Sequence, residues 1–198
     1  LFLKGIVFPP KLNVNSSLKE VLKNEITIVA VPVKFLRSII RRIKHTNKSL
    51  KGKIFLSVAK GVEGNSFKRP SEIIKEELND VKTAVLSGPT IAKEVVSEIP
   101  TACVIASENK YTAKKLQKIV STPRFRVYYH HDVIGVELGG ALKNIIAIAC
   151  GISDGLGFGT NTKAAILSRG LVEIARFGKK LGAKEVTFSG VSGLGDLA

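Results

Sequence analysis

The chain has 198 residues, which suits one large or two small domains, and 44% of them are hydrophobic, enough for a sizeable core. It carries 31 basic and 16 acidic residues, so its net charge of +15 suits an anionic partner such as nucleic acid, a membrane surface or a phosphorylated small molecule. No apolar run is expected to span a bilayer, and the first residues lack the parts of a signal peptide. These features argue against stable membrane insertion and predict a cytoplasmic location.

The chain holds few sulfur-containing residues, namely two cysteines and no methionine. Cys103 and Cys150 lie in apolar surroundings without CxxC or CxxH spacing, so we expect free, buried thiols in a reducing compartment and no metal site. Because the chain begins at Leu1 without an initiator and stops at Ala198 just after a glycine-rich turn, we expect it to be an internal fragment.

Apolar runs alternate with helical patterns through the first 130 residues. Runs rich in β-branched and aromatic residues predict five strands, at residues 26–31, 54–58, 83–86, 101–106 and 125–129. Helical patterns follow the first four strands, at residues 34–53, 71–78, 91–97 and 112–120. This alternation predicts an α/β fold with a doubly wound, mainly parallel Rossmann-like sheet, whose continuous apolar strands fit burial on both faces.

The densest basic cluster of the chain lies at residues 34–53. Leu36, Ile39, Ile40 and Ile43 recur at helical spacing within it, which predicts an amphipathic helix with a solvated basic face. A nucleic-acid-binding module remains an alternative on charge alone. However, no zinc-finger or RNP pattern supports it, and few aromatic residues are interleaved with the basic ones.

Two loops follow neighbouring strands at the sheet edge where ligands of such folds bind. Lys60 comes directly after the second strand, beside Gly61, and Gly88-Pro89-Thr90 follows the third. The second loop offers backbone N–H groups and a hydroxyl near a helix start, which suits a phosphate or a carboxylate. Each loop alone is more often an ordinary turn, but their equivalent positions favour a shared binding site.

After about residue 130 the strand pattern disappears. Asp132 can cap a long apolar helix that runs to about Cys150, and residues 162–181 predict another helix. Residues 151–160 and 190–196 are expected to be glycine-rich loops. The GLGFG run at 155–159 follows a helix and lacks the G-x-G-x-x-G spacing, and that dinucleotide fingerprint occurs nowhere in the sequence. We therefore expect the start of an all-helical second domain.

Lys143 stands within the most apolar part of this helical region. Gly139 and Gly140 lie on the same face of the helix and are expected to clear a hollow beside its side chain. Because each glycine costs a helix about 1 kcal/mol relative to alanine, two in one turn indicate that something approaches the backbone there. The spacing fits equally well a lysine that takes part in proton transfer and one that extends along its stem to water.

At this point five motifs in series resemble the bacterial NAD(P)-dependent glycerol-3-phosphate dehydrogenases. They are AKGVE at 59–63, LSGPTIAKE at 86–94, IGVELGGALKN at 134–144, ACGISDGLG at 149–157 and GVSGLGDL at 190–197. The resemblance implies that residues 1–130 are the remainder of a dinucleotide-binding domain whose N-terminal unit is missing. It implies that residues 131–198 are the first part of a helical substrate domain, with a Ser-Arg-Asn segment following Ala198.

The resemblance also implies a reaction, namely reversible hydride transfer between NAD(P)H and dihydroxyacetone phosphate, giving sn-glycerol 3-phosphate for phospholipid synthesis. Lys143 would then be the general acid that protonates the carbonyl oxygen, and it would also contact the substrate. Lys60 matches a lysine that contacts both substrate and cofactor. Ala92 matches a cofactor contact. Further substrate contacts are implied at four positions: Gly88, Thr90, Asn144 and Asp196.

Other interpretations stay open at this stage. A related two-domain reductase acting on a hydroxy acid or ketopantoate would share much of this build. The choice between NAD and NADP depends on a residue of the missing opening unit. Besides the substrate, the expected partner is a second copy of the complete protein in a homodimer, with no nucleic acid bound.

Overall fold

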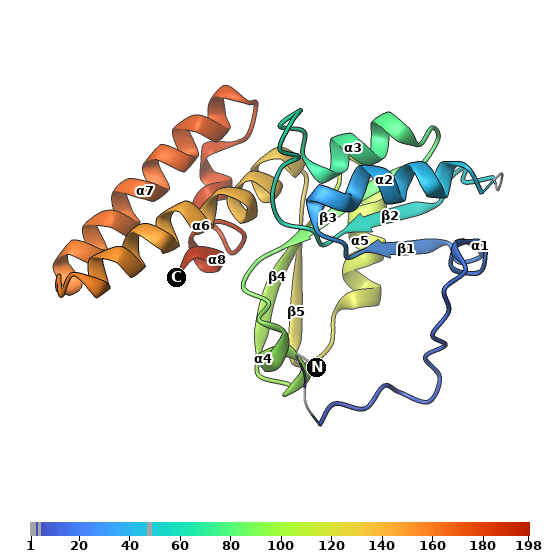
Figure 1. Ribbon diagram of the computed structural model, residues 1–198, viewed down its shortest axis with the longest axis horizontal. Helices are drawn as coiled ribbons and strands as arrows, with labels where there is room; N and C mark the ends of the chain where they lie inside the picture. The colour runs from blue at the N-terminus through green and yellow to red at the C-terminus, as the bar shows by residue number, and fades with distance from the viewer. Residues whose placement is uncertain (1–2, 4, 47–48) are drawn as a thin grey trace.

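The computed structural model describes residues 3, 5–46 and 49–198, and it contains a five-stranded sheet in the order β1-β2-β3-β4-β5 (Figure 1). The strands are β1 (Ile26–Val29), β2 (Ile54–Ser57), β3 (Lys82–Ser87), β4 (Thr101–Ala106) and β5 (Phe125–His130). The five predicted strands are therefore confirmed, with ends that shift by at most two residues.

The sheet is mainly parallel, as predicted, but β3 and β4 pair antiparallel. The connection between them contains only α4 (Ala92–Val96), a helix of five residues. Because β4 is antiparallel to β3, the chain enters β4 at the edge where β3 ends. Consequently β4 and β5 run opposite to the first three strands.

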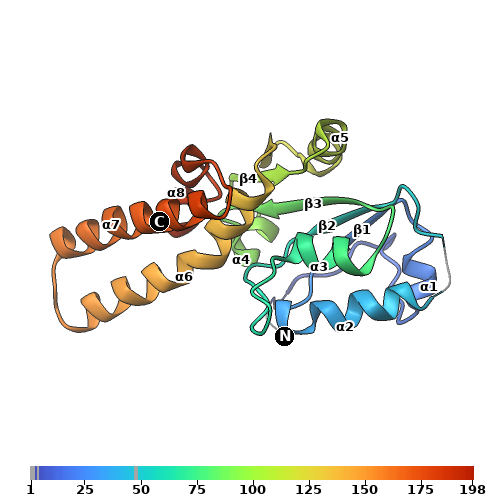
Figure 2. The same cartoon turned by 90° about the horizontal axis from the view of Figure 1, so that it is seen from above.

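Helices cover both faces of the sheet, which confirms the doubly wound arrangement. Figure 2 shows α2 (Val33–Lys44) and α3 (Pro70–Glu77) on one side of the strands and α5 (Lys110–Val120) on the other. Side chains alternate accordingly, because Phe55 packs with α2 and α3 whereas Ile54 and Leu56 pack with Leu116 of α5. A short helix, α1 (Leu18–Val21), precedes β1.

The basic amphipathic helix is confirmed, but it is shorter than the predicted 34–53. Helix α2 ends at Lys44, and Leu36, Ile40 and Ile43 form its buried face. The helix ends there because the helical spacing of apolar residues stops at Ile43. The predicted range also includes residues 47–48, which lie outside the described residues.

The chain after β5 contains helices and no strand among its described residues. Helices α6 (Val133–Gly155) and α7 (Thr160–Lys180) form a hairpin that projects from the sheet (Figure 1), followed by the 3-10 helix η1 (Glu185–Ser189) and α8 (Leu194–Leu197). Two predicted loops are thus partly wrong. Helix α6 continues past Cys150 to Gly155, and the predicted loop at 190–196 contains most of α8. In α6 the cost of glycine, about 1 kcal/mol per residue relative to alanine, is too small to end a helix that is already formed.

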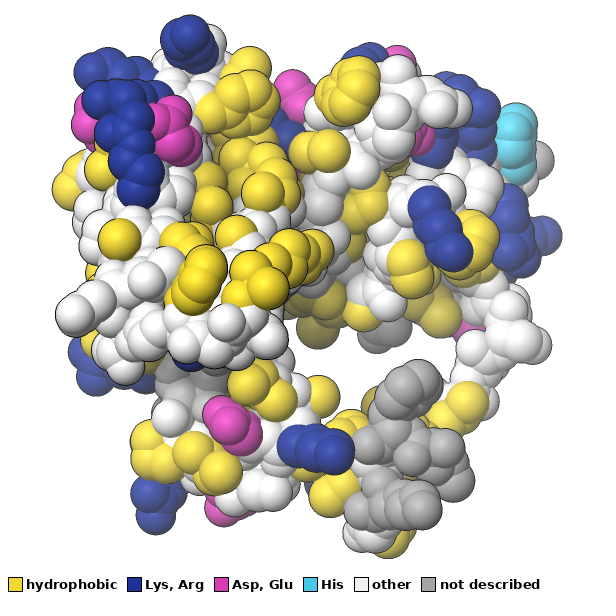
Figure 3. All heavy atoms as spheres, turned by 60° about the vertical axis from the view of Figure 1, so that its left-hand side comes forward, with side chains coloured by type: hydrophobic (Ala, Val, Ile, Leu, Met, Phe, Trp, Pro, Cys, Tyr) yellow, Lys and Arg dark blue, Asp and Glu magenta, His cyan; other side chains and the backbone are white. Residues whose placement is uncertain are grey.

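Helix α6 is also longer and more apolar than the sequence analysis allowed. Its 23 residues include an 18-residue window that is apolar enough to cross a bilayer, and the helix has the length to do so. The expectation that no run could do so is therefore wrong. A core helix meets the same criteria, and 44% of the window is buried within the molecule. The second half leaves Ile145, Ile148 and Ile152 exposed. Figure 3, turned so that the left-hand side of Figure 1 comes forward, shows hydrophobic side chains gathered on that face of the molecule.

Candidate functional site

Two lysines from different parts of the chain meet on one carboxylate. Lys60 follows β2, Lys143 lies in α6 and Asp196 lies in α8. The Lys60 Nζ donates to Asp196 Oδ2 at 2.6 Å, and the Lys143 Nζ donates to Asp196 Oδ1 at 2.5 Å and to the backbone oxygen of Asp196 at 2.7 Å. Three residues that the sequence analysis singled out therefore form one cluster.

Gly88, at the edge of the sheet, is a fourth member of the cluster. The Lys60 Nζ donates to the backbone oxygen of Gly88 at 2.9 Å, and Thr90 Oγ1 donates to the same oxygen at 3.2 Å. Gly88 has φ +140°, and a Cβ there would lie 3.0 Å from the Cα of Cys103. Only glycine suits both the conformation and the close approach. The two loops predicted at the ends of β2 and β3 are thus side by side.

Gly139 and Gly140 of α6 explain how the segment that carries Asp196 packs against the helix. A Cβ on Gly139 would lie 2.5 Å from the backbone oxygen of Ser192, and one on Gly140 would lie 2.6 Å from Ser87 Oγ. The inference that something approaches the helix backbone is confirmed. The expected hollow beside Lys143 is wrong, because the polypeptide chain itself fills the space. The absence of side chains lets the segment that carries Asp196 pack directly on the helix.

The electrostatics of the cluster favour an anion. Asp196 has a side chain only 1% exposed and faces two ammonium groups, so the three charged groups sum to +1. Burial lowers the pKa of Lys60, an effect that the neighbouring Asp196 opposes and the charge of Lys143 reinforces. The Ser87 hydroxyl lies buried close by and has no hydrogen-bond partner in the described part of the chain. Lys60 and Lys143 remain 29% and 24% exposed, so a ligand can reach both.

Two predicted contacts lie outside this hydrogen-bonded cluster. Asn144 follows Lys143 on α6 but is exposed, and Ala92 begins α4 and is exposed as well. Two hollows also lie elsewhere. One of about 600 Å³ lies beside Ile99 and Phe125, and one of about 330 Å³ lies between α6 and α7. These hollows lack the convergent charges of the lysine–aspartate cluster, which is therefore the candidate functional site.

The sequence analysis missed a buried carboxylate that joins α6 to α3. Glu137 accepts hydrogen bonds from the backbone N–H of Ser71 at 2.8 Å, from Ser71 Oγ at 2.6 Å and from Arg69 at 2.6 Å. Burial raises the pKa of Glu137, and its partners Ser71 and Arg69 oppose that change. A glutamate between Val136 and Leu138 in an apolar run was the available signal.

Asp132 is confirmed as the N-cap of α6, and it has a second function. Its Oδ1 accepts from the backbone N–H of Gly135 at 2.9 Å. Its Oδ2 accepts from the backbone N–H of Lys184 and from Thr187 Oγ1, at 2.8 and 2.6 Å. The cap therefore also fixes η1, the element that leads to Asp196.

Comparison with known families identifies the family of this chain. A sequence model described as the NAD-dependent glycerol-3-phosphate dehydrogenase N-terminus matches residues 1–113, and the corresponding C-terminus model matches residues 132–198. The chain belongs to this dehydrogenase family. The resemblance drawn from the five motifs is thereby confirmed, and the nucleotide specificity of the family is consistent with the expected NAD or NADP.

Curated relatives carry the name glycerol-3-phosphate dehydrogenase (NAD(P)+). The protein of Thermoanaerobacter sp. (strain X514) is 50% identical over 191 residues, which cover 96% of this chain and 57% of the relative. The Clostridium tetani protein is 46% identical over 197 residues, covering 99% and 56%. The chain thus spans less than two thirds of the length of these relatives.

Solved structures show the same likeness. A glycerol-3-phosphate dehydrogenase from Coxiella burnetii is 39% identical with a TM-score of 0.91, over 98% of this chain and 59% of that one. The Saccharomyces cerevisiae enzyme is 33% identical with a TM-score of 0.87, over 98% and 59%. A ketopantoate reductase from Ralstonia eutropha is only 13% identical with a TM-score of 0.53, so that it shares the fold alone.

Proposed function

We propose that this chain supplies the proton-transfer and substrate-binding groups of a glycerol-3-phosphate dehydrogenase. The reaction would interconvert dihydroxyacetone phosphate and sn-glycerol 3-phosphate with NAD(H) or NADP(H), providing a precursor for phospholipids. The observation that carries the proposal is the meeting of Lys60 and Lys143 on the buried carboxylate of Asp196. Family membership and the names of the relatives support it.

Lys143 is the group that we propose to move the proton. Reduction of the substrate would place negative charge on its carbonyl oxygen, and the Lys143 ammonium can donate a proton to that oxygen. In the reverse direction the neutral amine accepts the proton from the hydroxyl. Asp196 orients the amine, because its side-chain and backbone oxygens accept two of the three Nζ hydrogens. With the amine held in this way, we propose that its third hydrogen is directed to the substrate oxygen.

Lys60 and the loop after β3 are proposed to bind the phosphorylated substrate. The Lys60 ammonium is held at Gly88 and faces Asp196, so its charge lies at the edge of the sheet beside the Thr90 hydroxyl. Charge-assisted hydrogen bonds to an anion are the strong ones in proteins. Asn144, exposed next to Lys143, would provide a further polar contact once substrate is bound.

The residues of this chain fit part of a dinucleotide site. A bound nicotinamide cofactor would supply the hydride. Lys60 and Ala92 stand at the end of β2 and the start of α4, where Rossmann-like sheets receive nucleotides. The G-x-G-x-x-G turn that holds the pyrophosphate does not occur in the sequence. We therefore assign Lys60 and Ala92 as cofactor contacts and no residue of this chain as the pyrophosphate site.

The same resemblance supports an assignment of the two parts of the chain. Residues 1–130 would belong to a dinucleotide-binding domain and residues 131–198 to a helical substrate domain. It also supports a homodimer in the cytoplasm. Size-exclusion chromatography of the hybrid enzyme defined below would test the dimer.

The test uses a hybrid enzyme, in which this chain replaces the 197 matching residues of the Clostridium tetani relative. Every proposed substrate-binding and proton-transfer group then comes from this chain. We expect oxidation of NADH or NADPH that depends on dihydroxyacetone phosphate and is absent with ketopantoate. Turnover with ketopantoate alone would contradict the proposal and favour the related reductases.

A further inference from the structure

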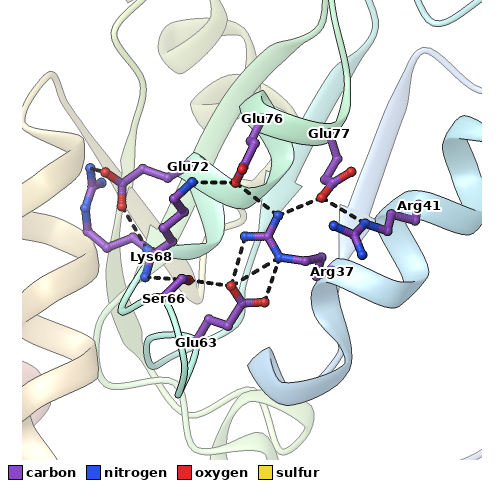
Figure 4. A network of polar contacts seen from close by, with 9 residues as sticks. Arg37, Arg41, Glu63, Ser66, Lys68, Glu72, Glu76 and Glu77 are labelled. Atoms are coloured by element: carbon purple, nitrogen blue, oxygen red, sulfur yellow. Dashed lines mark hydrogen bonds and ion pairs between the residues drawn. The ribbon is translucent and has the colours of Figure 1, made fainter.

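A cluster of ion pairs surrounds Arg37 on the sheet face that α2 and α3 cover. Figure 4 shows the guanidinium of Arg37 at the centre of three carboxylates from two different segments. It binds Glu63 in a bidentate manner, with Nε to Oε1 at 2.8 Å and Nη2 to Oε2 at 2.9 Å. Its Nη1 donates to Glu76 at 3.0 Å and to Glu77 at 2.6 Å. One side chain of α2 thus binds both α3 and the loop after β2.

The geometry of this cluster differs from that of an ordinary surface ion pair. Exposed single pairs contribute little to stability, whereas bidentate pairs in networks hold their geometry better. The Arg37 side chain is only 18% exposed. Without Arg37, the three carboxylates would repel one another, and Glu63 would be the carboxylate least strongly held in place. The hydrogen bonds of Arg37, followed by one from Ser66, lower the pKa of Glu63 to about 2, so the pair stays charged near neutral pH.

Glu63 stands in the loop that begins with Lys60. The loop turns at Gly61, whose φ of +128° favours glycine and where a Cβ would lie 3.5 Å from Val33 at the start of α2. The Glu63 backbone closes the rest of the loop. Its N–H donates to the backbone oxygen of Lys68 at 2.9 Å, and its oxygen accepts from the backbone N–H of Phe67 at 2.8 Å. The Arg37–Glu63 pair therefore fixes the backbone from which the Lys60 side chain extends.

Lys60 needs such support, because its side chain is long and its surroundings partly oppose its charge. Fixing a lysine side chain costs more rotamer entropy than fixing most other side chains. Burial and the nearby Lys143 both disfavour the charged form of Lys60, and Asp196 favours it. A small shift of the loop would move the ammonium from the position where Gly88 and Asp196 both accept its hydrogens.

We propose that Arg37 is a positioning residue, which clamps the loop after β2 through Glu63 and thereby holds Lys60 in the lysine–aspartate cluster. The inference that this affects substrate binding rests on the proposed function of Lys60. The clamp itself does not, and it can be measured without turnover. Arg41 provides a matched control, because it lies one turn further along α2, is 59% exposed and binds Glu77 but not the loop.

The first experiment is hydrogen–deuterium exchange of the 198-residue chain, analysed by mass spectrometry. In Arg37→Met we expect the amides of residues 62–68 to exchange at least about tenfold faster than in the unchanged chain, while those of β2 and β3 keep their rates. In Arg41→Met the same loop should stay within about twofold. If Arg37→Met does not fold, Glu63→Gln replaces it, with Glu77→Gln as its control, because Glu77 contacts Arg37 and Arg41 but no residue of the loop. Equal loop exchange in a variant and its control would overturn the clamp.

The second experiment is a double-mutant cycle in the hybrid enzyme. Arg37→Met should raise the KM for dihydroxyacetone phosphate at least about fivefold and change kcat less than about twofold, whereas Arg41→Met changes neither. In a Lys60→Ala background, Arg37→Met should raise the KM for dihydroxyacetone phosphate by a further factor of less than about 1.5, because Arg37 acts through Lys60. If the effects of Arg37→Met and Lys60→Ala on KM multiply in the double variant, Arg37 acts independently of Lys60. That result would overturn the positioning role and leave the proposed function intact. If Lys60→Ala itself has no effect, the role given to Lys60 is wrong, and the exchange experiment still judges the clamp.

Discussion

Replacing Gly139 with alanine tests how the candidate site is assembled. The new Cβ would lie 2.5 Å from the backbone oxygen of Ser192, 3.2 Å from its carbonyl carbon and 3.3 Å from the Cα of Gly193. These are backbone atoms, so no side-chain rotation can relieve the contact. The segment must move away from α6, and Asp196 moves with it.

The magnitude follows from two opposing terms. Overpacking in a well-packed region costs about 1–3 kcal/mol, whereas alanine in a helix interior gains about 1 kcal/mol over glycine. Gly151→Ala on the same helix isolates the second term, because a Cβ at Gly151 meets nothing within 4 Å. The free energies of unfolding of the two variants should therefore differ by about 1–3 kcal/mol. At about 2–4 °C per kcal/mol, Gly139→Ala should melt roughly 2–12 °C below Gly151→Ala.

Thermal unfolding of the 198-residue chain, followed by circular dichroism, measures this difference. In the hybrid enzyme, Gly139→Ala should also lower kcat/KM, because Asp196 shifts relative to the two lysines, while Gly151→Ala should not. Equal melting temperatures for the two variants would refute the reasoning, since the contact between α6 and Ser192 would then be absent.

Four further outcomes are expected. In the hybrid enzyme, Lys143→Ala should lower kcat about 100- to 10,000-fold with KM little changed, as for loss of a general acid; initial rates decide, and a near-normal kcat would rule out proton transfer by Lys143. Lys60→Ala should lower kcat/KM more than about tenfold through KM, because a charge-assisted hydrogen bond contributes about 1.5–3 kcal/mol; unchanged KM values for substrate and cofactor would make it an ordinary loop lysine. The 198-residue chain alone should not oxidise NADH or NADPH with dihydroxyacetone phosphate, because its sequence lacks the pyrophosphate turn; robust turnover would contradict this. Burial shields the Cys103 thiol and raises its pKa to about 12, so at pH 8 it should react with a disulfide reagent at least about tenfold slower than in the denatured chain, as mass spectrometry can show; comparable rates would contradict its burial.

Local sequence patterns determined most of the sheet and one side of the site. Strands such as 101–106 were predictable because a β-branched run between turn residues favours a strand over a helix. The parallel pairing of β1, β2 and β3 then places Lys60 and Gly88 at one edge. The direction of β4 was not predictable from its own residues, because it depends on how the connection that contains α4 packs against the rest of the molecule.

Lys143 could be singled out from the sequence because a charge within an apolar helix is unusual, but its partners could not be derived from spacing. Asp196 is 136 residues from Lys60, and the resemblance alone suggested that it belongs with the lysines. The spacing of Gly139 and Gly140 showed that something approaches the helix. Only packing decided that Ser192, and not a ligand, fills the space beside Gly139. Local propensity acts over one turn or one strand, whereas contacts between distant segments depend on how buried faces fit together, and that is determined by the tertiary structure.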